Sequence, residues 1–202
     1  MVQLNHGHVR KVYSGPMNID AQRLIGDILA LFDRSGDVSY GEDVTQRQHA
    51  LQAAQLAESG GASPALVLAS LLHDVGHLLH PDAAQALEHS QDDAHEEIGA
   101  DWLDQYFGPE VSQPVALHVQ AKRYLCYSDP GYYDSLSDVS KTTLALQGGV
   151  FDEAQADQFL QRPHALEAIS LRRWDERAKC RDAQTPTLQH FLQSVPHCLR
   201  GA

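Results

Sequence analysis

Apolar residues recur along most of the chain at the three- and four-residue spacing that places them on one side of a helix. After Asp20, which can cap a helix, the apolar residues from Leu24 to Phe32 follow this spacing. A capping-box pattern over residues 45–48 opens a second predicted helix, which reaches Glu58 before the Gly60-Gly61 stop. No alternating stretch is long enough to predict a strand. The predicted fold class is therefore all-α.

The same signals predict the remaining helices. They begin at Ser63-Pro64, at Asp92 or Asp93 (through Phe107), at Pro109 and at Ser137, and three more cover 152–160, 164–179 and 187–194. The run from residue 65 to 72 has no polar face, which favours a buried central helix. Residues 123–136 are rich in aromatic residues and turn formers and are predicted to be a loop. Residues 1–16 show no helical period, so we expect a loose N-terminal arm or a cloning remnant, followed by a single domain over 17–202.

Charge and cysteine content narrow the function classes. The 202 residues include 27 acidic and 15 basic residues, a net charge of −12, which disfavours binding to a phosphate backbone. No apolar run approaches the ~18 residues of a membrane span, and the chain does not open like a signal peptide. The three cysteines lack CxxC spacing, which argues against disulfides or a thiolate zinc site. We therefore expect a soluble cytoplasmic protein with a small-molecule partner; the sequence leaves its oligomeric state open.

Histidine is the outlier in composition. The chain has twelve histidines, about twice the usual share for this length, and they are scattered along the sequence. The strongest local signal is His73-Asp74 in the string LLHDVGHLLH, at the end of the predicted buried helix. A charged Asp on so apolar a run is costly unless it is paired or bound to a metal. Both side chains can reach one ion if the helix ends there, and Gly76 allows such an end.

Other candidate ligands surround this pair along the sequence. His49 lies in the middle of the preceding predicted helix, and His95 lies in the first turn of a later one. His118 precedes Lys122 by four residues, and Asp175 follows Arg172 by three, so each of these two pairs shares one helical face. A single histidine of this kind is more simply explained as a core or surface residue, but the ordered set is not. Four imidazoles with two carboxylates suit iron or manganese better than tetrahedral zinc.

This ordered set resembles the HD-domain superfamily of metalloproteins, and its two extra histidines resemble the dinuclear branch. The resemblance implies an HD-domain helical bundle around two metal ions. Asp74 would bridge them, one ion taking His49, His73 and Asp175 and the other taking His95 and His118.

Flanking strings give a narrower resemblance. They are Tyr40-Gly-Glu42, AKRYLC at 121–126, SDVSKTTLALQGG at 137–149 and LRRWDERAK at 171–179. Together they resemble the mixed-valent di-iron oxygenases of organophosphonate catabolism. The resemblance implies two irons poised as Fe(II)/Fe(III), O2 as co-substrate and oxidative cleavage of a C–P bond. The expected substrate is 1-hydroxy-2-(trimethylamino)ethylphosphonate, giving glycine betaine and phosphate; the alternative is 2-amino-1-hydroxyethylphosphonate, giving glycine and phosphate.

The resemblance also implies roles for individual residues. Lys122, Ser140 and Arg172 match positions that hold the phosphonate group. Tyr40 and Glu42 match a lid pair in which the tyrosine is displaced from iron by substrate and the acid faces the substrate nitrogen. These two residues are two apart here, whereas they are three apart in the enzyme for the amino substrate. Because of this difference, the sequence leaves open how the lid pair is aligned and whether the substrate nitrogen is an amine or a trimethylammonium group.

Residues outside this set have plainer interpretations. Arg173, Arg177 and Lys179 are expected to form a solvated helix face, and Trp102, Tyr106 and Trp174 to belong to the core. His77 is expected to support the ligands or the fold, and His80, His89 and His164 to lie on the surface.

Two other function classes remain open at this stage. Many HD proteins are phosphohydrolases, in which the metals activate water against a phosphate ester without dioxygen. A regulatory module without activity is the third possibility, and the intact ligand set argues against it. A requirement for dioxygen would distinguish an oxygenase from a phosphohydrolase.

Overall fold

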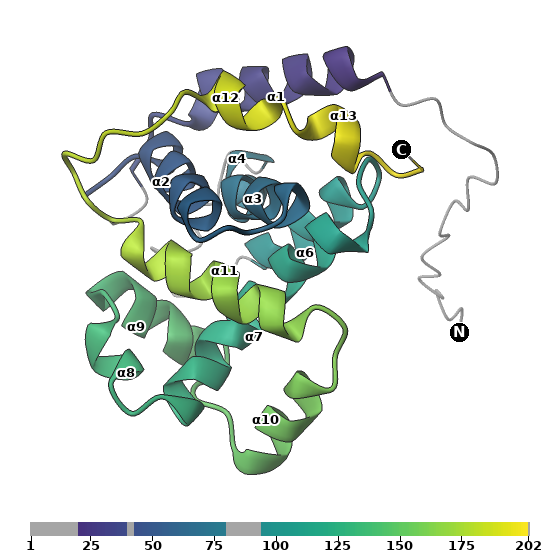
Figure 1. The fold of residues 1–202 in the computed structure, drawn as a ribbon. Helices are drawn as coiled ribbons and strands as arrows, with labels where there is room; N and C mark the ends of the chain where they lie inside the picture. The colour runs from purple at the N-terminus through teal and green to yellow at the C-terminus, as the bar shows by residue number, and fades with distance from the viewer. Residues whose placement is uncertain (1–19, 40–42, 80–93, 202) are drawn as a thin grey trace, which may run out of the picture.

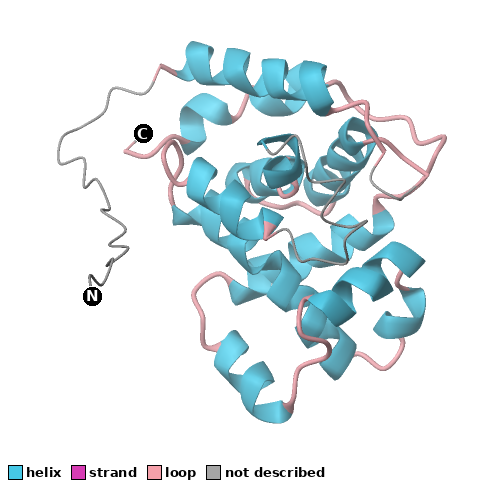
Figure 2. Cartoon of the chain, turned by 180° about the vertical axis from the view of Figure 1, so that it is seen from behind, coloured by secondary structure: helices cyan, strands magenta, loops and turns pink. Residues whose placement is uncertain are grey.

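The computed structural model describes residues 20–39, 43–79 and 94–201. The N-terminal arm, Tyr40, Glu42, His80, His89 and the alternative caps Asp92 and Asp93 lie outside these residues. Within the described parts of the chain the structure is helical, and its β structure is limited to two isolated bridges (Figure 2). The all-α prediction is confirmed. None of the described helices combines the length and apolar composition needed to cross a membrane.

Three helices of the N-terminal half begin at the caps that the sequence predicts. Asp20 caps α1, Thr45 forms the complete capping box with Gln48, and Ser63 caps α3 with Pro64 in the first turn. The bounds are α1 Ala21–Ser35, α2 Gln46–Ser59, α3 Pro64–Leu71, α4 Val75–Leu79 and α6 His95–Leu103.

The C-terminal half follows from Gly108 onward. Its helices are α7 Pro109–Ser128, α8 Tyr132–Ser135, α9 Asp138–Leu146, α10 Glu153–Leu160, α11 Ala165–Arg177, α12 Leu188–Leu192 and α13 Val195–Cys198. Ser137 caps α9 through the backbone N–H of Ser140, as its sequence position predicted.

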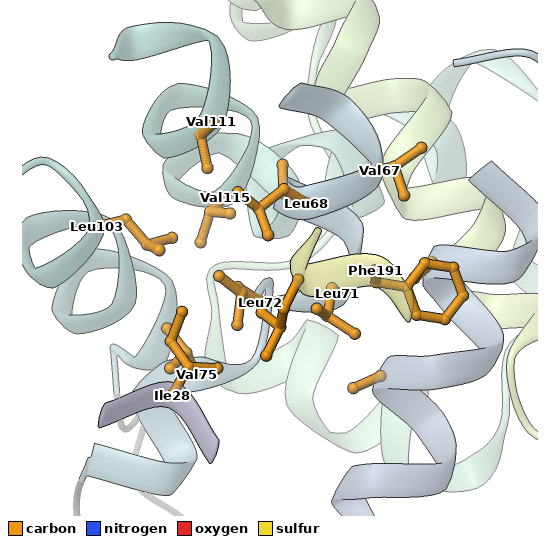
Figure 3. Close-up of a cluster of buried hydrophobic side chains, with 14 of the residues drawn as sticks. Ile28, Val67, Leu68, Leu71, Leu72, Val75, Leu103, Val111, Val115 and Phe191 are labelled. Carbon is orange, nitrogen blue, oxygen red and sulfur yellow. The ribbon is translucent and has the colours of Figure 1, made fainter. Parts of the chain in front are cut away.

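Helix α3 is the centre of the fold. Leu68, Leu71 and Leu72 are fully buried, and Figure 3 shows them between Val115 of α7 on one side and Phe191 of α12 on the other. Helix α1 lies beside α12 and α13 across the top of the molecule in Figure 1, while α7 and α11 cross below α3. Because α3 is apolar on every side, it is stable only when helices surround it. The prediction of a buried central helix is confirmed.

The lower part of the molecule is built on two long helices. Helices α8, α9 and α10 pack around the C-terminal half of α7 and the adjoining face of α11 (Figure 1). Two small apolar clusters, separate from the main core, hold them there: one includes Phe151 and Phe159, and the other includes Tyr132, Leu136 and Leu144. This arrangement places α9 beside the C-terminal half of α7, where Leu144 packs against Leu125.

Three local predictions were wrong. Residues 123–128 continue α7, because Tyr124 and Leu125 pack in apolar clusters; the chain leaves the helix at Asp129, and residues 132–135 form α8. Helix α6 ends at Leu103, not Phe107. Gly76 lies inside the short helix α4 and does not end a helix.

Candidate metal centre

Six of the predicted ligands meet at one place in the fold. His49 comes from α2, His73 and Asp74 from the turn between α3 and α4, His95 from the start of α6, His118 from α7 and Asp175 from α11. The ligand atoms of His49, His73 and Asp74 lie within 4.8 Å of one another, and so do those of Asp74, His95 and His118. The two groups share Asp74. We call these six residues the metal cluster.

A close helix contact brings His95 to this place. A Cβ atom added to Gly76 would lie 2.1 Å from the backbone oxygen of His95, and one added to Gly99 would lie 3.2 Å from the backbone nitrogen of Gly76. Two glycines thus allow α4 and α6 to touch through their backbones. The reason for glycine at position 76 is this close approach.

Main-chain carbonyl groups fix three of the four imidazole rings. The Nδ1 atoms of His49, His73 and His118 lie 2.9, 2.9 and 2.7 Å from the carbonyl oxygens of Ala178, Ser70 and Val115. Because a carbonyl can only accept, each Nδ1 carries the hydrogen and each neutral ring directs the lone pair of Nε2 away from it. That tautomer is the one that binds a metal through Nε2.

The Nε2 atoms converge in pairs. Nε2 of His49 lies 3.1 Å from Nε2 of His73, and Nε2 of His95 lies 3.2 Å from Nε2 of His118. Where both rings of a pair present lone pairs at this distance, only a shared cation makes the arrangement favourable. Two nitrogens bound about 2.1 Å from one ion lie ~3.0 Å apart at a right angle and ~3.4 Å apart in a tetrahedron. The observed spacing lies between these two values, so each pair could share one metal ion.

The two carboxylates complete the cluster. Asp74 faces both histidine pairs: its Oδ1 lies 3.5 Å from His73 Nε2 and 3.6 Å from His95 Nε2, and its Oδ2 lies 3.7 Å from His49 Nε2. Asp175 faces the first pair only, with Oδ1 3.2 Å from His49 Nε2. This is the geometry of one bridging and one terminal carboxylate. The predicted division of ligands between the two ions stays a prediction that the geometry fits.

The charges within the cluster favour cation binding. Burial lowers the pKa of His73 and, more strongly, that of His118, which keeps both rings neutral. Burial also opposes ionisation of Asp74 and Asp175, but the pKa of each is lowered nevertheless: the surrounding imidazoles outweigh burial at Asp74, and Arg172 outweighs it at Asp175. His49 differs, because its hydrogen bond to Asp175 and the two carboxylate charges outweigh burial and raise its pKa to about 8. A cation at this place would replace that proton.

A second polar cluster adjoins the first through Arg172. The Arg172 guanidinium donates through one terminal nitrogen to Asp175, and its other terminal nitrogen lies 2.6 Å from Glu176 Oε2 and 3.2 Å from Ser140 Oγ. Lys179 Nζ lies 3.1 Å from the same Ser140 Oγ. Lys122 reaches α9 one turn further along, with Nζ 2.8 Å from Thr143 Oγ1. We call Lys122, Ser140, Arg172, Glu176 and Lys179 the anion cluster.

Two cations of this cluster are buried. Lys122 and Arg172 are each only 5% exposed. Burial, with a smaller contribution from the charge of Arg172, lowers the pKa of Lys122 to about 7. Arg172 shows the opposite balance. Burial lowers its pKa, but Asp175, Tyr132 and Glu176 raise it by more, so the net change is upward and the guanidinium stays charged. Ordinary surface bases would not be buried in this way.

The sequence analysis missed Glu176 and misplaced Lys179. Lys179 is not on a solvated face, since its Nζ lies 2.9 Å from both Ser137 Oγ and Glu176 Oε1; Arg173 and Arg177 are exposed as expected. A signal was present in the spacing, because positions 172, 175 and 176 share one face of α11 and Lys179 follows just beyond its end. Knowing that this face points inward required the packing of α11 on α7.

The structure also places the aromatic residues and the further histidine that lie outside the two clusters. Trp102, Tyr106 and Trp174 pack against the main core as expected. His77 stacks on His95 with ring centroids 4.1 Å apart, which supports its predicted place beside the ligands. Tyr132 is buried in an apolar cluster, whereas Tyr127 and Tyr133 are exposed.

Comparison with known proteins agrees with this geometry. The family model of the HD domain matches residues 47–178. The chain is 40% identical over 178 residues to the hydroxymethylphosphonate dioxygenase of Gimesia maris, covering 87% of this chain and 88% of that protein. It is 39% identical over 166 residues to the [1-hydroxy-2-(trimethylamino)ethyl]phosphonate dioxygenase (glycine-betaine-forming) of Leisingera caerulea, covering 82% and 85%. An uncharacterised protein of Acanthamoeba polyphaga mimivirus is 31% identical over 170 residues, covering 83% and 78%.

The matched HD region contains every residue of the metal cluster and most of the anion cluster. The alignments with the two dioxygenases cover more than four fifths of the chain. The chain belongs to the HD-domain family, in the group that includes these phosphonate dioxygenases.

Proposed function

We propose that this protein catalyses the O2-dependent oxidative cleavage of the C–P bond of a 1-hydroxyphosphonate. The observation that carries the proposal is the contact between the two clusters. Arg172 donates to the predicted metal ligand Asp175 and, from the same guanidinium, reaches the anion cluster. An anion held by Arg172 and Lys122 would therefore lie next to the metal ions.

The two metal ions that we propose are irons in the Fe(II)/Fe(III) state. The mixed imidazole and carboxylate donors favour iron over zinc, which prefers a closed tetrahedron in structural sites. With dioxygen as co-substrate, the bound irons would supply the redox chemistry of the reaction.

The protein side chains position the substrate and balance its charge. A phosphonate group carries up to two negative charges, and the buried cations Lys122 and Arg172 match them in an otherwise acidic protein. The fixed imidazole rings hold the metals in one geometry, so little rearrangement is needed when substrate arrives. Their burial also limits the access of water to the reacting carbon.

The substrate class follows from what the relatives share. The two named substrates both carry a hydroxyl group on the carbon bonded to phosphorus, and they differ in what else that carbon bears. We therefore propose a 1-hydroxyphosphonate, with the trimethylammonium compound as the first candidate. The expected recognition of its nitrogen depends on Tyr40 and Glu42, which lie outside the described residues.

The test is phosphate release by the iron-loaded protein in air and under argon. Three substrates are compared: the trimethylamino compound, its primary amine analogue and hydroxymethylphosphonate. We expect release in air and none under argon, with the fastest substrate identifying the substituent. Arg172→Gln should lose this activity, while Arg177→Gln, on an exposed part of the same helix, should retain it. Release of phosphate from nucleotides under argon, with no phosphonate turnover in air, would instead show a phosphohydrolase.

A further inference from the structure

The Glu176 carboxylate lies within the anion cluster as a fully engaged hydrogen-bond acceptor. Its Oε1 accepts from the backbone N–H of Ser137 at 3.0 Å and from Lys179 Nζ at 2.9 Å. Its Oε2 accepts from Ser140 Oγ at 3.0 Å and from Arg172 at 2.6 Å. The side chain is only 8% exposed. Two cations, a hydroxyl and a backbone amide at the start of a helix are the donors that bind a phosphate or phosphonate group.

The hydrogen-bonding capacity of Ser140 is used up by this arrangement. A hydroxyl group has one hydrogen and two lone pairs. Ser140 Oγ gives its hydrogen to Glu176 and accepts from Arg172 at 3.2 Å and from Lys179 at 3.1 Å. Ser140 therefore has no hydrogen left for a phosphonate oxygen unless Glu176 gives up its place.

One nitrogen of Arg172 has no acceptor. Both of its terminal nitrogens face carboxylates, but its buried Nε–H has no acceptor among the residues that the structure describes. A buried donor of this kind favours binding of an acceptor such as an anion oxygen. Lys122 Nζ, which has three N–H groups, donates to Thr143 Oγ1 at 2.8 Å.

We propose that Glu176 is an internal anion that competes with the substrate for the donors of this site, and that a bound phosphonate takes the Ser140 hydroxyl from it. Glu176 is then a positioning residue that sets how tightly the site binds anions. In the free protein it keeps Ser140, Arg172 and Lys179 in place and balances their charge. The inference rests on the proposed function for the identity of the anion, and its test below measures binding without turnover.

The proposal and a purely structural role for Glu176 predict opposite changes in anion affinity. If Glu176 only supported its neighbours, Glu176→Gln would loosen Ser140 and Arg172 and weaken anion binding. If it competes, the amide removes a negative charge beside the anion and accepts more weakly from Ser140, so anions should bind more tightly. One unit charge at this distance in a protein environment is enough for about a tenfold lower dissociation constant, allowing for screening.

The experiment is calorimetric titration of the metal-loaded protein with inorganic phosphate. We expect Glu176→Gln to lower the dissociation constant about tenfold, and Glu153→Gln, which removes an exposed carboxylate on α10, to leave it within about twofold. The gain should be smaller in the Ser140→Ala background, because the released hydroxyl is then missing and only the change in charge remains. Unchanged or weaker binding by Glu176→Gln, or a gain of the same size without the Ser140 hydroxyl, overturns the proposal.

A second measurement tests the proposal in case Glu176→Gln does not fold. Metal content and thermal unfolding show whether Glu176→Gln folds. If it does not, a crystal structure of the wild-type protein with phosphate decides: the Ser140 hydroxyl should contact phosphate and lie beyond hydrogen-bond distance of Glu176. A Ser140–Glu176 hydrogen bond that survives phosphate binding would rule the exchange out. Because neither readout requires C–P cleavage, loss of the proposed activity and failure of this inference would be seen separately.

Discussion

The metal cluster and the anion cluster are held in different ways. In the metal cluster, His49, His73 and His118 are oriented by main-chain carbonyl groups. In the anion cluster, Ser140 and Arg172 are oriented mostly by other side chains, above all by Glu176. Both clusters are buried, and both lie against α7 and α11.

The difference matches what each cluster has to do. A carbonyl at the end of a helical turn moves only if the helix moves, so the imidazole rings keep one orientation. A side-chain carboxylate can rotate away and release its partners. The side chains of the metal cluster are therefore held in a fixed geometry, whereas the hydrogen bonds of the anion cluster can rearrange when a side chain rotates.

Arg172 connects the two clusters. Its guanidinium donates to Asp175 in the metal cluster and to Glu176 in the anion cluster, which are adjacent on α11. A planar guanidinium, with donors at fixed angles, serves both carboxylates at once. Arg172 therefore joins the two clusters through direct hydrogen bonds.

The largest effect is expected from removing the bridging carboxylate. Asp74→Asn should lose both metal ions and lower turnover by at least about a thousandfold, because Asp74 faces both histidine pairs and an amide is a poor ligand. Metal analysis and phosphate-release assays measure this, with the exposed Asp157→Asn on α10 as the control. A variant that keeps both ions would show that Asp74 does not bridge them.

A smaller effect is expected from the backbone contact that places His95. Gly76→Ala should destabilise the protein by about 1–3 kcal/mol and weaken metal binding, since the new Cβ would overlap the carbonyl of His95. Urea unfolding with metal analysis measures both quantities. Gly26→Ala is the matched control: Gly26 lies in α1 with nothing within 4 Å of the added Cβ, and the change should stabilise by about 0.5–1 kcal/mol. Equal effects at both positions would contradict the role given to the close contact.

The smallest effect is confined to the anion cluster. The pKa of Lys122 is lowered to about 7, so its ammonium form is complete well below pH 7 and is lost as pH rises through that value. Binding of sulfate, which keeps two charges over this range, should weaken as pH rises above about 7, by up to about tenfold per pH unit. Calorimetry of the metal-loaded protein at several pH values measures this. Lys122→Arg should remove the dependence; the same slope in that variant would assign it to another group.

Local signals predicted the helices well and the metal ligands by type. Asp20, Thr45, Ser63 and Ser137 cap helices where the sequence placed them, because capping depends on neighbouring residues alone. The buried Asp74 could be recognised because an acid on an apolar run needs a partner. Residues 123–128 were misassigned because their aromatic composition is compatible with either a loop or a helix, and packing against α10 and α11 decided for the helix.

The anion cluster shows the limit of the sequence. The face of α11 that carries Arg172, Asp175 and Glu176 could be read from their spacing, but its direction could not, because a charged helix face points to solvent in most proteins. The sequence by itself determined the helical class, several helix starts and the types of the candidate ligands, since these follow from near neighbours in the chain. Only the tertiary structure decided that the carbonyl of Ala178 orients His49 and that Glu176 accepts from Ser140. Those contacts join residues that are far apart in the sequence, and their geometry exists only once the helices have packed.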